Sequence, residues 1–412
     1  MNIFFKVLNF LYKHGHWTVT GRVFVGLLNL FLSVILTKLM STSDYGNYQY
    51  YISIFLLLEF CSNPGASNAV VKYVALGKDW SCNFLLKQRI KFSFIASIIF
   101  AVLSIYNIFV GDYFESIIYL SFSIFFPFYF SYDLFLYYLH AKIELKRLNI
   151  ILIIRSLTQL FFTILVFKLS NNVLITLISF IASASMLNWF FYKKNVEIFS
   201  ASNHEPNVKK DAQKMAIGLS LVGILGTIVL QIDKILIFNL IDSKSLAIFS
   251  IGMMIGVSIN SLFKSILSSL DAKLVVHNIK KWHYWFIFFF GSIIGAIISL
   301  ITPFIIETLY GEEYKESAYY ASIVILSLGL YLVNHLLDNA YILHHTKNIV
   351  PIYVSKVGVA IIQLALILLL FLFGSSSKEI LKYLPYVYVS KILIQILLIN
   401  LSNYKIQRNN LI

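Results

Sequence analysis

The chain has 412 residues, of which 59% are hydrophobic and only 13% are charged, and its formal net charge is +14. Soluble globular domains carry about 25% charged residues, so this composition excludes an ordinary soluble fold. The apolar residues also come in blocks of about 20, the length of helix that crosses a bilayer. The sequence therefore predicts an all-α membrane protein.

Twelve apolar blocks follow one another along the chain. We expect membrane-spanning helices at 17–39, 48–70, 90–111, 115–139, 149–168, 172–192, 216–240, 246–269, 284–309, 318–341, 350–373 and 381–402. Asn63-Pro64-Gly65 interrupts the second block, and because Pro removes a helical hydrogen bond and Gly relaxes the backbone, a kink or hinge is expected there. Pro127 and Pro303 are further kink candidates. We see no removable signal peptide before the first block.

The basic residues are distributed unevenly between the two sides of these blocks. Of the 33 Lys and Arg, 21 lie before the first block or in every second loop after it, a group that includes Lys87, Arg89 and Lys91. Six lie in the opposite loops and six within the blocks. Cytoplasmic loops carry the excess of Lys and Arg, so both termini are expected in the cytoplasm. The basic excess is thus a topology signal together with attraction to anionic membrane lipids, and not a sign of nucleic-acid binding.

The two halves of the chain resemble each other. The longest polar stretch, 193–215, is expected to be a cytoplasmic linker between a six-helix lobe at 1–192 and another at 216–412. A shift of 201 residues places Asp112-Tyr113-Phe114-Glu115-Ser116 on Glu313-Tyr314-Lys315-Glu316-Ser317. The same shift places Leu39 on Leu240, Tyr48 on Phe249, Lys146 on Lys347 and Arg155 on Lys356. Six helices per half make the repeat parallel.

Six basic residues lie within the apolar blocks: Arg22, Arg155, Lys234, Lys264, Lys356 and Lys391. A charge at the bilayer centre costs roughly 2.5–3.5 kcal/mol on insertion scales, so the set predicts a wet, cationic interior and an anionic cargo. The candidate substrate-binding residues are Arg22, Arg155, Lys234, Lys356 and Lys391. The repeat places Arg155 and Lys356 on opposite walls of one cavity. The alternative for such residues is snorkelling to headgroups, and interfacial anchoring is at least as strong an explanation for Lys264.

Four acidic residues also lie within the blocks: Glu59, Asp133, Asp233 and Asp338. They could be counter-ions that keep the helices folded, or sites for proton or cation coupling. The two cysteines and nine histidines show no ligand-like spacing, and we find no P-loop or G-x-G-x-x-G pattern. The sequence therefore predicts no metal, no cofactor and no catalytic residues.

Three segments resemble the polysaccharide-repeat-unit flippases (O-antigen, Wzx-type) of the multidrug/oligosaccharidyl-lipid/polysaccharide (MOP) exporter superfamily. They are Leu39-Met40-Ser41-Thr42-Ser43-Asp44-Tyr45-Gly46-Asn47-Tyr48, Gln231-Ile232-Asp233-Lys234 with Ala247-Ile248-Phe249-Ser250, and Leu309-Tyr310-Gly311-Glu312-Glu313-Tyr314. The resemblance implies two six-helix lobes around a cationic cavity, in a bacterial cytoplasmic (inner) membrane. It also implies an undecaprenyl-pyrophosphate-linked O-antigen or capsule repeat unit as cargo, flipped to the outer leaflet, with polymerase and other polysaccharide-assembly proteins as partners.

Other functions stay open at this point. A multidrug exporter of the same fold would favour an acidic lumen for its cationic drugs, which six basic against four acidic residues disfavour. A membrane saccharide polymerase or ligase would need a large outer loop, and the outer loops are short. A major-facilitator transporter also has parallel halves, but Leu76-Gly77-Lys78-Asp79-Trp80 lacks the Gly-Arg-rich signature of that family.

Overall fold

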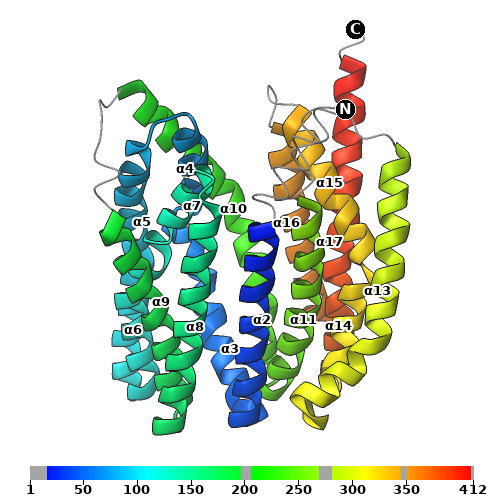
Figure 1. The fold of residues 1–412 in the computed structure, drawn as a ribbon. Helices are drawn as coiled ribbons and strands as arrows, with labels where there is room; N and C mark the ends of the chain where they lie inside the picture. Colours follow the sequence, from blue (N-terminus) through cyan, green and yellow to red (C-terminus); the bar gives the residue numbers. More distant parts are fainter. Residues whose placement is uncertain (1–15, 196–205, 269–280, 345–349, 410–412) are drawn as a thin grey trace. The chain divides into compact units, whose positions relative to one another are not determined.

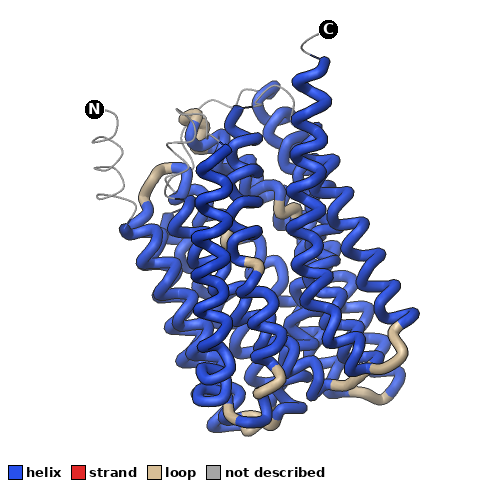
Figure 2. Tube along the Cα trace, turned by 90° about the vertical axis from the view of Figure 1, so that its right-hand side faces the viewer, coloured by secondary structure: helices blue, strands red, loops and turns tan. Residues whose placement is uncertain are grey.

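The computed structural model describes residues 16–195, 206–268, 281–344 and 350–409, and within these ranges the chain is helical with short connections and no strand (Figures 1 and 2). The elements are α2 (His16–Leu39), α3 (Thr42–Leu57), η2 (Leu58–Ser62), α4 (Gly65–Ala75), α5 (Trp80–Val110), α6 (Tyr113–Ser131), α7 (Leu134–Ala141), α8 (Leu145–Ser170), α9 (Val173–Asn195), α10 (Pro206–Leu240), α11 (Ser243–Ser268), α13 (Lys281–Tyr310), η4 (Glu312–Tyr314), α14 (Ser317–Leu326), α15 (Leu328–His344), α16 (Val350–Phe373) and α17 (Ser377–Asn409).

The helices confirm an all-α, multi-pass membrane protein. Among the described residues, nine helices are long and apolar enough to cross a membrane, and two bent pairs raise the number to eleven if each pair is one span. The apolar part of α2, Val23–Leu39, is shorter. A count of twelve spans and a cytoplasmic position for both termini stay predictions, because the chain ends and part of the expected linker 193–215 lie outside the described residues.

The expected kink at Asn63-Pro64-Gly65 is present. The helix axis turns by 50° there, and Asn63 takes a left-handed backbone conformation with φ 58°. The amide of Gly65 donates to the hydroxyl of Ser220 on α10 at 2.8 Å, and that hydroxyl bonds to Oδ1 of Asn63 at 2.5 Å. A side chain of α10 therefore satisfies the backbone donor at the break, which lipid could not do.

A second bend of 47°, between α14 and α15, has no proline in either helix. Gly329, at the start of α15, packs directly on α13, since a Cβ there would lie 2.4 Å from the carbonyl oxygen of Phe288. The bend therefore follows from close packing of two helices. Pro127 and Pro303, in contrast, lie inside the helices α6 and α13.

The chain forms two compact units. Unit 1 comprises Met1–Gln49 and Ile232–Ile412, and unit 2 comprises Tyr50–Gln231. Both boundaries fall inside helices, α3 and α10, so no loop separates the units. Helix α2 belongs to unit 1, where it packs against α11 and α13. Most of α10 belongs to unit 2. The expected lobes at 1–192 and 216–412, which the repeat defines, stay a prediction.

Each unit has its own core. In unit 2, Phe55 of α3 packs on Phe122 and Phe126 of α6, with ring centroids 4.9 and 5.4 Å apart. A second cluster joins α4, α5, α7 and the start of α10 through fully buried Ala66, Ala69, Leu85, Leu139 and Ala216.

Residues matched by the 201-residue shift occupy similar places in their helices. Leu39 and Leu240, both in unit 1, are the last residues of α2 and α10. Tyr119 on α6 of unit 2 and Tyr320 on α14 of unit 1 are both buried, as are Ser116 and Ser317 near the starts of the same helices. These matched pairs therefore resemble each other in local structure as well as in sequence.

Replacing Gly65 with alanine tests the packing at the first bend. A Cβ at this position would lie 2.2 Å from the carbonyl oxygen of Ala216, so α4 and α10 must separate. Overpacking of this kind costs about 1–3 kcal/mol, and we expect Gly65→Ala to lower the melting temperature of the purified protein. Gly218→Ala on α10 is the matched control, because a Cβ there meets nothing within 4 Å. Equal melting temperatures for both variants would contradict this account.

Candidate functional site: two buried polar networks

A buried ion pair joins α5 to the turn between α6 and α7. One Arg89 guanidinium nitrogen lies 3.0 Å from a carboxylate oxygen of Asp133 and donates to the hydroxyl of Ser67 at 3.0 Å. Arg89 is only 2% exposed. The expectation that Arg89 lies in a cytoplasmic loop is wrong, because α5 begins at Trp80 and carries Arg89 on its buried face.

Arg155 on α8 extends this network in unit 2. Its guanidinium lies 3.4 Å from Oδ1 of Asn188 on α9 and 5.3 Å from the ring centroid of Tyr129. The amide of Asn188 in turn donates to the carbonyl oxygen of Tyr129 at 2.9 Å. Arg155 is also close enough to Asp133 to interact with it electrostatically.

The unit 2 network is balanced in charge. Glu59 of η2 interacts electrostatically with both Arg89 and Asp133, so two of the predicted acidic residues meet Arg155 and the unpredicted Arg89 in one place. Two positive and two negative charges offset each other here. Such a network stabilises a buried cluster only while every partner is present.

The polar network of unit 1 is built on α15, α16 and α17. Asp338 accepts a hydrogen bond from Nε2 of Gln395 at 3.0 Å, and Oε1 of Gln395 accepts one from Nδ2 of Asn334 at 3.1 Å. Asp338 also interacts electrostatically with Lys356 of α16 and Lys264 of α11. The structure thus brings the predicted Asp338 and Lys356 together. It also adds Lys264, for which the sequence offers interfacial anchoring as an alternative explanation.

Lys391 lies on the polar face of α17, between Tyr388 and Gln395. The spacing of three and then four residues places all three on one side of a helix. Tyr388 interacts electrostatically with Asp233 of α10, and Asp233 interacts with its neighbour Lys234. Lys391 itself is largely buried, yet it forms no hydrogen bond or ion pair with any residue in the described part of the chain.

The remaining predicted residues are placed as follows. Arg22 lies on α2, in unit 1, but its side chain is outside the described residues. Arg155 belongs to unit 2 and Lys356 to unit 1, so their expected position on opposite walls of one cavity stays a prediction. Over the described ranges, no group of three His, Cys, Asp or Glu residues could hold a metal ion.

The two networks share a plan. In unit 2, Arg155 on α8 interacts with Asp133, and the side-chain amide of Asn188 on α9 donates to Tyr129, four residues before that acid. In unit 1, Lys356 on α16 interacts with Asp338, and the side-chain amide of Gln395 on α17 donates to that acid. They differ in charge. Unit 1 places Lys264 and Lys356 near Asp338 and Lys234 beside Asp233, with Lys391 as a fourth lysine on α17. Chemically, unit 1 can receive an anion.

Sequence reasoning missed Arg89 and the amide residues of both networks. Arg89 follows Cys82, Leu85 and Leu86 at helical spacing, and all four are at most 2% exposed, so a period of 3.6 residues would have placed it on the buried face. Asn188 and Gln395 stand alone within apolar segments. A lone amide inside a membrane span is a signal, because lipid offers it no hydrogen-bond partner.

The comparisons with known proteins agree with this fold. A family model described as "Polysaccharide biosynthesis protein" matches residues 11–270. An inward-facing multidrug resistance MATE transporter of the MOP superfamily shares 10% identity and a TM-score of 0.64, covering 95% of this chain and 98% of its own. The lipid II flippase MurJ, in an inward closed conformation, shares 14% identity and a TM-score of 0.67, covering 92% and 86%.

A further solved structure has the same fold. A MOP superfamily transporter from Pyrococcus furiosus, described by the reverse polarity of its binding pocket, shares 11% identity and a TM-score of 0.60, covering 96% of this chain and 95% of its own. No curated protein matches the chain in sequence.

Removing the Arg89 side-chain charge tests the buried ion pair. We expect Arg89→Gln to lower the free energy of unfolding by about 3–5 kcal/mol, because Asp133 is then left buried without its partner. The measurement is thermal melting of the purified protein. Lys315→Gln is the matched control, since Lys315 forms an exposed ion pair with Glu307 and such pairs contribute about 0–1 kcal/mol. If Arg89→Gln melts like the control, the ion pair does not hold unit 2 together.

Proposed function

Since the chain belongs to the polysaccharide biosynthesis protein family, we propose that it is a flippase for a lipid-linked oligosaccharide. The proposed cargo is an undecaprenyl-pyrophosphate-linked repeat unit of O-antigen or capsule, moved from the cytoplasmic to the outer leaflet of a bacterial inner membrane. The chain shares its fold with the lipid II flippase MurJ, which is in keeping with a lipid-linked cargo. Polymerase and other envelope polysaccharide-assembly proteins would be its partners.

The observation that carries the proposal is the excess of positive charge within the helices of unit 1. Lys234, Lys264 and Lys356 interact electrostatically with two aspartates, and partly buried Lys391 forms no hydrogen bond or ion pair with the described residues. Leaving charge unbalanced away from water is costly. A pyrophosphate would balance it and would form charge-assisted hydrogen bonds to the lysines. The prenyl tail of the cargo needs no polar site and can stay in lipid.

In this proposal the two networks have different roles. Lys234, Lys356 and Lys391 of unit 1, with Arg22 and Arg155, attract the headgroup in a cationic cavity between lobes 1–192 and 216–412. Twelve spans would place both termini in the cytoplasm. Rocking of the lobes would expose the cavity to each side in turn. The acids Glu59, Asp133, Asp233 and Asp338 would be counter-ions or coupling sites for an ion or proton.

A multidrug exporter is the second candidate, because a MATE transporter shares the fold. Cationic drugs would be repelled by the lysines of unit 1, which favours the flippase. A saccharide polymerase or ligase is less well supported, since the described connections at the Gly111, Asn171 and Gly311 ends of the helices are only a few residues long.

Lys391→Gln tests whether unit 1 binds the anionic headgroup. We expect export of surface polysaccharide to fall by about tenfold or more, since a hydrogen bond to a charged group contributes ~1.5–3 kcal/mol. The measurement is complementation of a flippase-deficient strain, with immunoblotting of the membrane fraction. Lys382→Gln is the control, because Lys382 is exposed on the same helix. Full export by Lys391→Gln would argue against this lysine as a cargo ligand.

The repeat-related pair provides a separate test. We expect Arg155→Ala and Lys356→Ala each to impair export without loss of protein from the membrane, because each removes a charge that would face the headgroup. Lys168→Ala, at the exposed end of α8, is the control. Should both Arg155→Ala and Lys356→Ala export normally, the symmetric pair plays no part in transport.

A further inference from the structure

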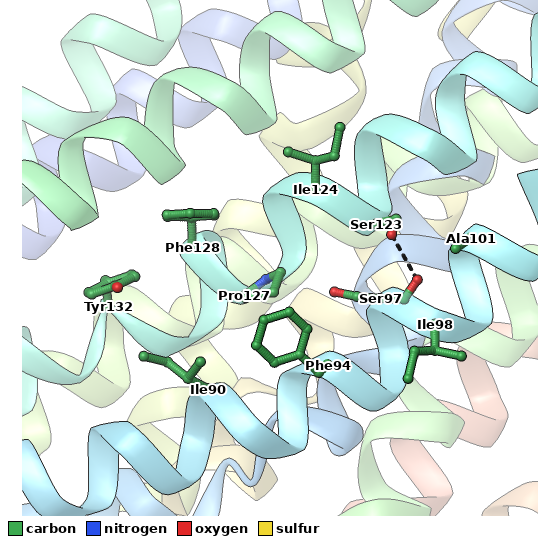
Figure 3. Close-up of a pocket in the computed structure, with 10 residues that line it drawn as sticks. All are labelled: Ile90, Phe94, Ser97, Ile98, Ala101, Ser123, Ile124, Pro127, Phe128 and Tyr132. Carbon is green, nitrogen blue, oxygen red and sulfur yellow. Dashed lines mark hydrogen bonds between the residues drawn. The ribbon is translucent and has the colours of Figure 1, made fainter.

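An apolar groove runs between α5 and α6 of unit 2. It has a volume of about 480 Å³ and is lined by Ile90, Phe94, Ser97, Ile98, Ala101, Ser123, Ile124, Pro127, Phe128 and Tyr132. Figure 3 shows the side chains of α5 along one side and those of α6 along the other. The volume lies within the ~300–1,000 Å³ of small-ligand sites.

The groove opens on a surface of the membrane helices that no other described part of unit 2 covers. Phe94, Ile98 and Ile124 are 54%, 62% and 54% exposed. Farther along α5 and α6, Val102, Ile105 and Leu120 are also about half exposed or more. Both helices are long and apolar enough to span a bilayer, so hydrocarbon chains surround this face.

Small residues and a proline create the hollow. Ser97, Ala101 and Ser123 leave space between the larger side chains of the walls. The hydroxyl of Ser123 donates to the carbonyl oxygen of Ser97 at 2.8 Å, which holds the two helices together below the groove (Figure 3). Pro127 lines the groove, and it has no N–H group to donate.

Two exposed lysines continue the groove toward the start of α5. Lys87 lies seven residues before Phe94, and Lys91 lies seven residues before Ile98. A seven-residue step is close to two turns, so each lysine shares a helix face with a wall residue, ~10 Å from it along the axis. Both lysines are exposed, and neither forms an ion pair with the part of the chain that the structure describes.

We propose that this face of unit 2 binds one anionic phospholipid of the bilayer, with an acyl chain in the groove and the phosphate at Lys87 and Lys91. The charges and the apolar hollow follow one another along α5 in the order of headgroup and chain. A zwitterionic lipid would offer the same chain but no net negative charge. An extended peptide would leave its backbone groups unsatisfied at this depth.

The lipid site is independent of the proposed cargo site. It uses none of the residues of the two polar networks, and it requires only that α5 and α6 lie in a bilayer. A protein that transports some other cargo would keep it. Failure of the cargo experiments would therefore leave this inference intact, and failure here would leave the cargo proposal intact.

Native mass spectrometry of the purified full chain tests the site. The protein is incubated with phosphatidylglycerol or with phosphatidylcholine of identical acyl chains. We expect the protein to retain one phosphatidylglycerol in preference to phosphatidylcholine. Each lysine should raise the ratio of the two bound lipids by about fivefold. Lys87→Gln/Lys91→Gln should abolish the preference. Lys210→Gln/Lys214→Gln is the matched control, because these two lysines of α10 are also exposed and four residues apart.

A second pair of variants tests the groove itself. Ser97→Phe or Ala101→Phe fills the hollow, and each should lower retention of both lipids at least fivefold while melting temperature is monitored. Equal retention of the two lipids by the wild type overturns the proposal. So does a preference that survives in Lys87→Gln/Lys91→Gln. Displacement of the bound lipid, mole for mole, by undecaprenyl phosphate in the absence of any phosphatidylglycerol preference would assign the groove to the cargo carrier instead.

Discussion

The cost of placing charge in hydrocarbon governs this molecule. A charged side chain within a membrane helix must find an opposite charge, a hydrogen-bonding cluster or water. Unit 2 meets this condition internally, since Arg89, Arg155, Glu59 and Asp133 offset one another. Unit 1 differs, since four lysines within its helices stand against two aspartates. The same constraint thus makes the unit 2 network a structural element, and the lysines of unit 1 are the basis of the proposed anion site.

The length of apolar segments was enough to predict most of the fold. Each of the twelve expected blocks lies largely on helix within the described residues, the family match shows a polysaccharide biosynthesis protein, and the fold that the resemblance implies is shared with solved MOP superfamily structures. The bend at Asn63-Pro64-Gly65 was predictable because proline and glycine mark it. The bend at Ser327 was not, because it arises where Gly329 packs on α13, a contact that only the folded chain defines.

The site could be predicted only in part. The sequence alone was enough to single out Arg155, Lys356, Lys391 and the four acids. Each is a charged residue within an apolar segment, where burying a charge costs free energy. Their partners could not be read in the same way. Gln395 reaches Asp338 across 57 residues of chain, and Asn188 reaches Arg155 across 33. The apolar block that begins at residue 90 puts Arg89 in a loop, whereas α5 already begins at Trp80 and its buried face carries Arg89.

The repeat explains why one plan can support two roles. The helices α8 and α9 of unit 2 and α16 and α17 of unit 1 give each unit a basic residue and an amide, with an acid nearby. One or two further side chains then determine the net charge of each network. In unit 2, Arg89 supplies a second cation and Glu59 a second anion, and the network closes on itself. In unit 1 the additional charged residues are mostly lysines, so that four lysines stand against two aspartates. Local resemblance between the halves is therefore compatible with an anion site that depends chiefly on unit 1, with Arg155 held near Asp133 as the contribution of unit 2.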